Sequence, residues 1–219
     1  MPYLEQADGK IWWETTGSGP ALMIIQGLGY SSDASWRLLR GLSSRHTVIT
    51  VDNCGVGRSD LPEEELTVER MAADAAAVIE AAQLGPVHVI GFSMGGLIAQ
   101  ELLLSHPQLV CSVVLGCTSP GGAAAVPFTP EMGARLLDLA TLPAREAAEK
   151  SASIVYSSRT AVAEIVADID VRMARPTSRE GYLAQLMAIG RYPGALDRLG
   201  QVERPVLILH GDSDLLVPP

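Results

Sequence analysis

The chemistry that this sequence suggests most directly centres on one serine. Ser93 lies in residues 91–95, which fit the pattern G-x-S-x-G between an apolar run and a helical pattern. A serine at a tight strand-to-helix turn adopts a strained backbone, and the flanking glycines remove side chains that would clash. The turn also aims the amide of Met94 at the space in front of the hydroxyl, where the helix N-terminus adds positive charge. We predict that Ser93 is a nucleophile and Met94 an oxyanion donor; an incidental serine in a glycine-rich turn is the alternative.

A second glycine-rich segment, Gln26-Gly27-Leu28-Gly29-Tyr30, follows the apolar run 21–25. An oxyanion hole needs a second amide from a neighbouring strand end, and glycines let that backbone approach closely. Leu28 is therefore the predicted second donor. Taken alone, the segment also fits an ordinary strand exit.

Two carboxylates follow the late apolar run 205–209, at Asp212 and Asp214. A carboxylate at such a strand end can hold the tautomer of a catalytic histidine and stabilise its protonated form. A solvated turn is the alternative interpretation of each aspartate. Spacing alone does not choose between them.

A serine nucleophile needs a general base, which is normally a histidine. The sequence has four histidines, and His46, His88 and His106 are expected in a loop, inside a strand and at a helix end. His210 is the one expected at the strand ends where the site should lie. It is the nearest substitute for a catalytic histidine, although a structural role is favoured for all four.

Residues 52–59 form a further glycine-containing turn after the apolar run 47–51. Two glycines two positions apart hint at a phosphate loop, but no third glycine opens a helix. The segment is interpreted as a structural turn beside the site.

The order of the predicted elements indicates how these residues are positioned. Asp8-Gly9 separates two short extended runs, which is typical of a hairpin. Strands are predicted at 21–25, 47–51, 87–90 and 110–115, and helices at 67–84 and after Ser93. Strands alternating with helices predict a mostly parallel sheet in an α/β protein.

Only helical patterns occur between residues 129 and about 192, before strand character returns at 205–209. Thr129 is predicted to cap one helix there, and Thr177 to Glu180 fit a capping box for another. The expected organisation is a first part of the core at 1–118, a helical cap insertion at 119–198, and a continuation of the core at 199–219.

Composition limits the function classes. The chain has 219 residues, of which 47% are hydrophobic, and a net charge of −9. The acidic balance argues against a nucleic-acid partner, and no apolar run is long enough to span a membrane. Three cysteines without C-x-x-C spacing and an N-terminus unlike a signal peptide favour a cytoplasmic protein. No metal or nucleotide cofactor is implied, and the oligomeric state is not predicted.

Taken together, these segments resemble the α/β-hydrolase superfamily, and most closely small esterases, 3-oxoadipate enol-lactonases and cofactor-free haloperoxidase-like proteins. The family pattern G-x-x-D-x-x-V-P maps onto Gly211, Asp214, Val217 and Pro218. The resemblance therefore selects Asp214 as the triad acid. Two departures are Gln26, where relatives usually have histidine, and Cys54, where they usually have arginine.

The same resemblance implies that the catalytic histidine follows the acid, beyond one further strand. Because this sequence stops at Pro219, we expect it to be a fragment that lacks the last strand and helix of the fold and the triad histidine, and that is impaired as an enzyme. The whole protein is expected to hydrolyse a small-molecule carboxylic ester or lactone through an acyl-enzyme. The alternatives are a non-catalytic small-molecule-binding member of the fold and a cofactor-free perhydrolase or lyase on the same scaffold.

Overall fold

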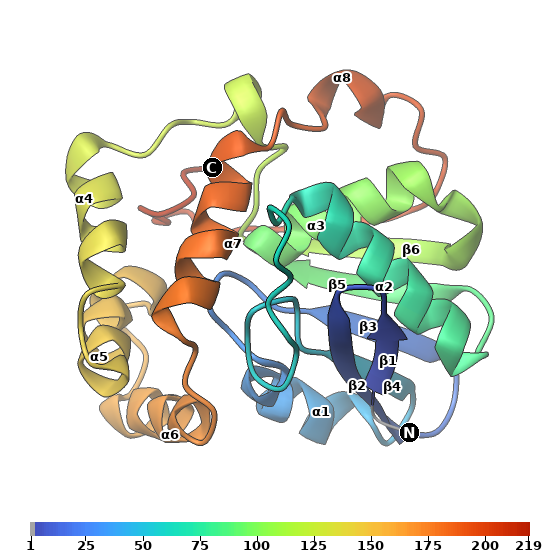
Figure 1. Ribbon diagram of the computed structural model, residues 1–219, viewed down its shortest axis with the longest axis horizontal. Coiled ribbons are helices and arrows are strands. Elements are labelled where there is room, and N and C mark those ends of the chain that lie inside the picture. Colours follow the sequence, from blue (N-terminus) through green and yellow to red (C-terminus); the bar gives the residue numbers. More distant parts are fainter. Residues whose placement is uncertain (1–2) are drawn as a thin grey trace.

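The computed structural model describes residues 3–219, which form one seven-stranded sheet surrounded by helices (Figure 1). The sheet order is β1-β2-β4-β3-β5-β6-β7. The strands are β1 (Tyr3–Gln6), β2 (Gly9–Gly17), β3 (Ala21–Ile25), β4 (Thr47–Val51), β5 (Val87–Phe92), β6 (Val110–Gly116) and β7 (Val206–Leu209).

The α-helices are α1 (Trp36–Leu42), α2 (Val68–Ala82), α3 (Met94–Ser105), α4 (Pro130–Leu139), α5 (Ala144–Val155), α6 (Val162–Met173), α7 (Arg179–Arg191) and α8 (Leu196–Leu199). Short 3₁₀ helices occur at Ser32–Ser35 (η1), Pro107–Leu109 (η2) and Gly122–Ala124 (η3). Helix α1 was not predicted from the sequence.

The pairing of the strands confirms the predicted hairpin and the mostly parallel sheet. Strands β1 and β2 pair antiparallel, with Gln6 opposite Gly9 across the Asp8-Gly9 turn, and β2 pairs antiparallel with β4. All other pairs, β3–β4, β3–β5, β5–β6 and β6–β7, are parallel. The carboxyl ends of the parallel strands therefore meet at one edge, where ligands bind in open α/β sheets.

Strand β3 shows why the central strands are continuously apolar. Met23 and Ile25 pack into the large core beneath α2 and α3, whereas Leu22 and Ile24 pack against α1 on the other side. Figure 1 shows α2 and α3 on one face of the sheet and α1 on the other. A strand covered on both faces has no position for a polar side chain, which removes the alternation of a half-exposed strand.

Helix α2 follows from its sequence in the predicted way. The Thr67 hydroxyl accepts a hydrogen bond from the amide of Arg70, which caps the helix. Val68, Met71 and Val78, which repeat at helical spacing, are all buried in the large core.

Residues 119–198 contain helices and no strand in the described chain. Helix α4 begins as predicted, with the Thr129 hydroxyl accepting from the amide of Met132. The predicted capping box at Thr177 is wrong by one residue, because Ser178 accepts from the amide of Gly181 and caps α7. The Thr177 hydroxyl instead donates to the carbonyl of Gly29 at 2.7 Å. The division of the chain into a core and a cap remains a prediction.

One ion pair, buried on its carboxylate side, joins the end of this helical segment to the sheet layers. Glu101 of α3 accepts hydrogen bonds from the Arg198 guanidinium at 2.7 and 2.8 Å and from the Tyr192 hydroxyl at 2.9 Å. These donors, Arg198 first, hold the pKa of Glu101 below its usual value.

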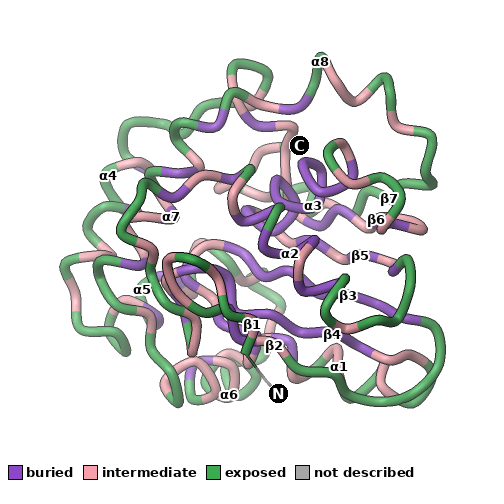
Figure 2. The backbone as a smooth tube through the Cα atoms, turned by 45° about the vertical axis from the view of Figure 1, so that its right-hand side comes forward, coloured by how far each residue is buried: buried purple, intermediate pink, exposed green. Residues whose placement is uncertain are grey.

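Strand β7 differs from the other parallel strands in being uncovered. All four of its residues are exposed, and Ile208 keeps 67% of its surface accessible. Figure 2 shows this contrast between β7 and the buried strands β3, β4 and β5. An apolar edge strand of this kind is a template for pairing with another chain.

Candidate active site

The turn between β5 and α3 places Ser93 in a conformation that few residues adopt. Its φ and ψ are 52° and −119°, outside the regions favoured by L-residues. The two flanking glycines are required by close approach, because a Cβ at Gly91 would overlap the carbonyl of Gly95 and one at Gly95 would overlap the carbonyl of Ile25. The structure therefore confirms that Ser93 lies at a tight turn between a strand and a helix.

Hydrogen bonds to its main chain hold Ser93 in this conformation. Its amide donates to the carbonyl of Gly116 on β6 at 2.9 Å. Its carbonyl accepts from the amide of Gly96 at 2.8 Å and from the Thr118 hydroxyl at 2.8 Å. A strained residue persists only where its surroundings over-determine it, and these bonds supply that constraint.

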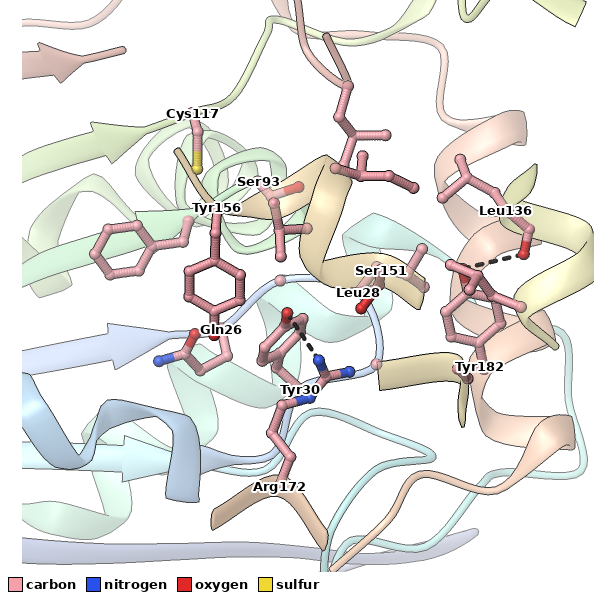
Figure 3. A pocket seen from close by; sticks show the side chains of 18 of the residues that line it. Gln26, Leu28, Tyr30, Ser93, Cys117, Leu136, Ser151, Tyr156, Arg172 and Tyr182 are labelled. Atoms are coloured by element: carbon pink, nitrogen blue, oxygen red, sulfur yellow. Dashed lines mark hydrogen bonds between the residues drawn. The ribbon is translucent and has the colours of Figure 1, made fainter. Parts of the chain in front are cut away.

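Ser93 lines a cavity of about 900 Å³ between the carboxyl ends of the strands and helices α4 to α7. Figure 3 shows the Ser93 side chain on the wall of this cavity, with Leu28, Tyr30 and Tyr156 around the same space. The lining also includes Gln26–Ser31 and Cys117, residues of α4, α5 and α6, the segment 175–179, Tyr182, and residues 211–217. The volume suits a small organic molecule.

The two predicted oxyanion donors lie on either side of the serine. A Cβ at Gly27 would be 3.2 Å from the Cβ of Ser93, so the loop that carries Leu28 approaches the serine closely. Leu28 lines the cavity, and Met94 is the first residue of α3 with its side chain buried. Within residues 3–219, neither main-chain amide donates to a protein acceptor. Neither amide is therefore committed to a protein acceptor in the described chain, as an oxyanion donor requires.

Side chains from two other segments fix the loop after β3. The Gln26 amide group donates to the Ser35 hydroxyl at 2.8 Å, and Asn53 donates to the Gln26 carbonyl at 3.1 Å. The Gln26 side chain is thus held by a hydrogen bond to Ser35, and its main-chain carbonyl is hydrogen-bonded to the turn after β4.

Gln185 of α7 connects the same loop to that turn. It is fully buried; its Oε1 accepts from the amide of Gly29 at 2.9 Å and its Nε2 donates to the carbonyl of Cys54 at 2.9 Å. The Cys54 thiol lies 3.0 Å from an Asp74 oxygen, to which it donates. Burial, together with the Asp74 charge, raises the pKa of Cys54, so the thiol stays protonated as a donor.

The turn at residues 52–59 is structural, as its pattern indicated. Asp52 is fully buried and accepts from the amide of Ser32 at 2.6 Å and from the amide and guanidinium of Arg58, both at 2.9 Å. A carboxylate already bound by these donors positions two loops and leaves no phosphate cradle.

Both candidate acids lie in the cavity wall after β7. One Asp214 oxygen accepts from the amides of Leu216 and Val217 at 2.9 Å, and its other oxygen is 3.7 Å from His210 Nε2. Asp212 accepts from the Ser213 hydroxyl at 3.0 Å. Asp214 is thus the more constrained of the two, which agrees with the choice made from the family pattern.

Across residues 3–219, the cavity wall contains no histidine. His210 Nε2 is 2.6 Å from the carbonyl of Val217 and so closes the turn that carries Asp214. His88 Nδ1 pairs with the Ser112 hydroxyl at 2.8 Å, between β5 and β6. These contacts agree with the structural roles predicted for both.

Cys117, which the sequence analysis did not assign, also faces the cavity (Figure 3). Burial raises the pKa of its thiol, and the nearby charge of Asp214 adds to the shift. A protonated thiol is a poor nucleophile, so Ser93 remains the stronger candidate.

Aromatic residues and one arginine complete the part of the cavity wall that the sequence did not reveal. The Tyr30 hydroxyl accepts from Arg172 at 3.1 Å, and the guanidinium lies 4.0 Å from the ring centroid (Figure 3). Burial raises the pKa of Tyr30 and raises that of Tyr182 to about 12, so both stay neutral donors. Arg172 was not predicted as a cavity residue, because the polar residues of α6 have the pattern of a solvent-exposed helix face.

A seam of polar contacts joins α6 and the segment after it to the first core helices. Asp168 accepts from the indole of Trp36 at 2.9 Å and from Arg37 at 3.0 Å. Arg175 pairs with Asp33 at 2.7 Å. The arginines of both pairs are substantially exposed, so water and salt reach these contacts.

No group of histidines, cysteines or carboxylates within residues 3–219 has the arrangement of a metal site. No helix in that part of the chain has the length and apolar character to cross a bilayer.

Comparisons with known proteins agree with this architecture. A family model described as alpha/beta hydrolase fold matches residues 20–219. RutD of Azorhizobium caulinodans, which is provisionally named a carbamate hydrolase, is 29% identical to this chain. The alignment covers 100% of this chain and 82% of RutD. An esterase from Exiguobacterium antarcticum superposes with a TM-score of 0.84 at 25% identity, covering 96% of this chain and 80% of that one. An enol-lactonase from Burkholderia xenovorans superposes with a TM-score of 0.84 at 21% identity, covering 100% of this chain and 84% of that one. At that identity the similarity shows the fold alone.

Proposed function

Since this chain belongs to the alpha/beta hydrolase fold family, we propose that it is the main part of a serine hydrolase for carboxylic esters or lactones. The observation that carries the proposal is the strained Ser93 turn, which presents a hydroxyl to the cavity beside two free amides. This arrangement serves acyl transfer, in which an oxyanion forms next to the attacked carbonyl. The name of the esterase neighbour is in keeping with that substrate class.

In the proposed reaction, the Ser93 oxygen attacks the carbonyl carbon while a general base accepts the hydroxyl proton. The amides of Leu28 and Met94 donate to the resulting oxyanion. Collapse of the tetrahedral intermediate expels the alcohol, which takes the proton from the base, and leaves an acyl-enzyme. Water, activated by the same base, then releases the acid and restores Ser93.

Asp214 is proposed as the acid that orients the base. Its first oxygen is held by two amides, which leaves its second oxygen available to accept a hydrogen bond from an imidazole. We propose that the base is a histidine of the whole protein outside residues 1–219. His210 is the competing candidate, and its bond to the Val217 carbonyl argues for a structural role.

Covalent labelling tests the nucleophile directly. A fluorophosphonate probe should label Ser93 in the whole protein, and Ser93→Ala should abolish both labelling and hydrolysis of p-nitrophenyl esters. Ser158→Ala is the matched control, because Ser158 lines the same cavity without the elbow geometry. Retained turnover in the Ser93 variant would sink the proposal.

A non-catalytic binding protein of the same fold is the second candidate. The absence of a histidine from the described cavity wall, together with the volume of the cavity, favours it. An idle serine should not react with the fluorophosphonate, whereas a catalytic one should. A perhydrolase or lyase on the same scaffold would retain labelling and be separated by a substrate panel.

A further inference from the structure

The cavity carries charge of the opposite sign to the whole chain. The protein has 16 basic and 25 acidic residues. Four arginines nevertheless line the cavity, against two aspartates. The arginines, residues 159, 172, 175 and 179, come from α6, the loops around it and the first residue of α7, and the aspartates come from the segment after β7. The cavity is therefore asymmetric in charge, with a basic end on the α6 side and an acidic end beside the segment after β7.

Arg172 is the one of these arginines that is both partly buried and without an ion-pair partner in the described chain, since Arg159 and Arg179 are also unpaired but exposed. Arg175 pairs with Asp33, and the α6 carboxylates Asp168 and Asp170 are engaged by Arg37 and Arg145. Within residues 3–219, no carboxylate lies within ion-pair distance of the Arg172 guanidinium. A half-buried cation without an anionic partner is costly unless a ligand supplies one.

The geometry around Arg172 leaves donors available for such a ligand. One nitrogen of its guanidinium donates to the Tyr30 hydroxyl at 3.1 Å, which leaves the other N–H groups without a protein acceptor in the described chain. Because Tyr30 accepts in that bond, its own proton is free to be donated. Figure 3 shows the pair inside the cavity, where the guanidinium reaches from α6 towards the Tyr30 hydroxyl. Neighbouring guanidinium and hydroxyl donors match a carboxylate.

We propose that the cavity selects esters or lactones that carry a carboxylate, which binds to Arg172 and Tyr30 while the reacting carbonyl lies at Ser93. This inference rests on the proposed function for the reacting end of the ligand only. The acidic side chains Asp212 and Asp214 repel a carboxylate at their end of the cavity. The ligand therefore binds in one orientation.

Binding of half-esters tests the proposal. Monomethyl and dimethyl esters of succinate, glutarate and adipate are titrated calorimetrically into the protein carrying Ser93→Ala, so that turnover does not disturb the measurement. At least one monomethyl ester should bind about tenfold or more tightly than its dimethyl ester, as expected for charge-assisted hydrogen bonds in a partly solvated site.

Variants locate the effect. Arg172→Gln should abolish the preference for the half-ester, and Tyr30→Phe should reduce it while keeping the ring. Arg145→Gln is the control, because it removes the same charge from a residue that pairs with Asp170 outside the cavity. If Arg172→Gln fails to fold by circular dichroism, the half-ester preference of the protein with Arg172 intact and the Tyr30→Phe result still decide.

The outcomes separate this inference from the proposed function. A half-ester preference that is absent at every chain length, or that persists in Arg172→Gln, overturns the inference. Labelling of Ser93 by the fluorophosphonate without such a preference keeps the hydrolase and removes the carboxylate site. A preference without labelling keeps the carboxylate site and removes the hydrolase.

Discussion

Replacing Gln185 by methionine should strongly destabilise the protein, because two main-chain groups depend on its side chain. Gln185 is fully buried, and its side chain joins the amide of Gly29 to the carbonyl of Cys54. Methionine has a similar shape but can neither donate nor accept strongly. The substitution therefore leaves one main-chain donor and one main-chain acceptor buried without a partner.

The magnitude follows from these two groups. Each buried group left without a partner costs about 1–3 kcal/mol, so together they lower the free energy of unfolding by about 2–6 kcal/mol. The total stability of a domain is only about 5–15 kcal/mol. With an m-value near ~2 kcal/mol/M, the urea midpoint should fall by about 1–3 M.

Urea unfolding followed by tryptophan fluorescence measures the stability, and hydrogen exchange measures the Gly29 amide. Exchange at Gly29 should accelerate, because the amide loses its only acceptor within the described residues. Gln201→Met is the matched control, because Gln201 is exposed and its loss should stay within about 0.5 kcal/mol. A loss below ~1 kcal/mol in Gln185→Met, with unchanged exchange at Gly29, would refute this reasoning.

Other perturbations test other parts of the fold. Gly95→Ala should prevent stable folding, because its Cβ would overlap a carbonyl of β3. Gly133 lies in open space on α4, so Gly133→Ala should stabilise the protein by about 0.5–1 kcal/mol. Thermal melts compare the two variants. The lowered pKa of Glu101 contributes stability above its usual pKa of 4.5 that is lost as pH falls through the lower folded-state pKa. Arg198→Gln should flatten that acid limb in unfolding curves between pH 3 and 7, and an unchanged limb would contradict the assignment. In the 219-residue chain, Ile208→Lys should reduce self-association, measured by light scattering, because it places a charge on the exposed β7 edge.

Local sequence signals predicted the sheet and the nucleophile turn because their causes are local. The apolar run at Ala21–Ile25 reflects burial on both faces of one strand, and the Gly91-to-Gly95 pattern reflects contacts within a few residues. The prediction of Leu28 as a donor likewise depended on glycines beside it.

The parts that were missed depend on contacts between distant segments. Gln185 lies 156 positions from Gly29, and Arg172 lies 142 positions from Tyr30. No local sequence pattern at either residue of these pairs indicates its distant partner. The capping box was misplaced for a similar reason, since the Thr177 hydroxyl is drawn to a carbonyl 148 positions away.

The seam between α6 and the first core helices has a kinetic consequence. The Arg37–Asp168 and Arg175–Asp33 pairs are partly solvated and flank the basic side of the cavity, whereas α7 is fixed by the buried Gln185. At an ionic strength of 0.15 M the screening length is about 8 Å, and it falls to about 3 Å at 1 M. Salt should therefore loosen α6 while leaving α7 in place, so ligand dissociation followed by stopped flow should accelerate with salt, and a salt-independent rate would show that the seam does not limit exit. We therefore expect the residence time of a ligand to shorten as ionic strength rises.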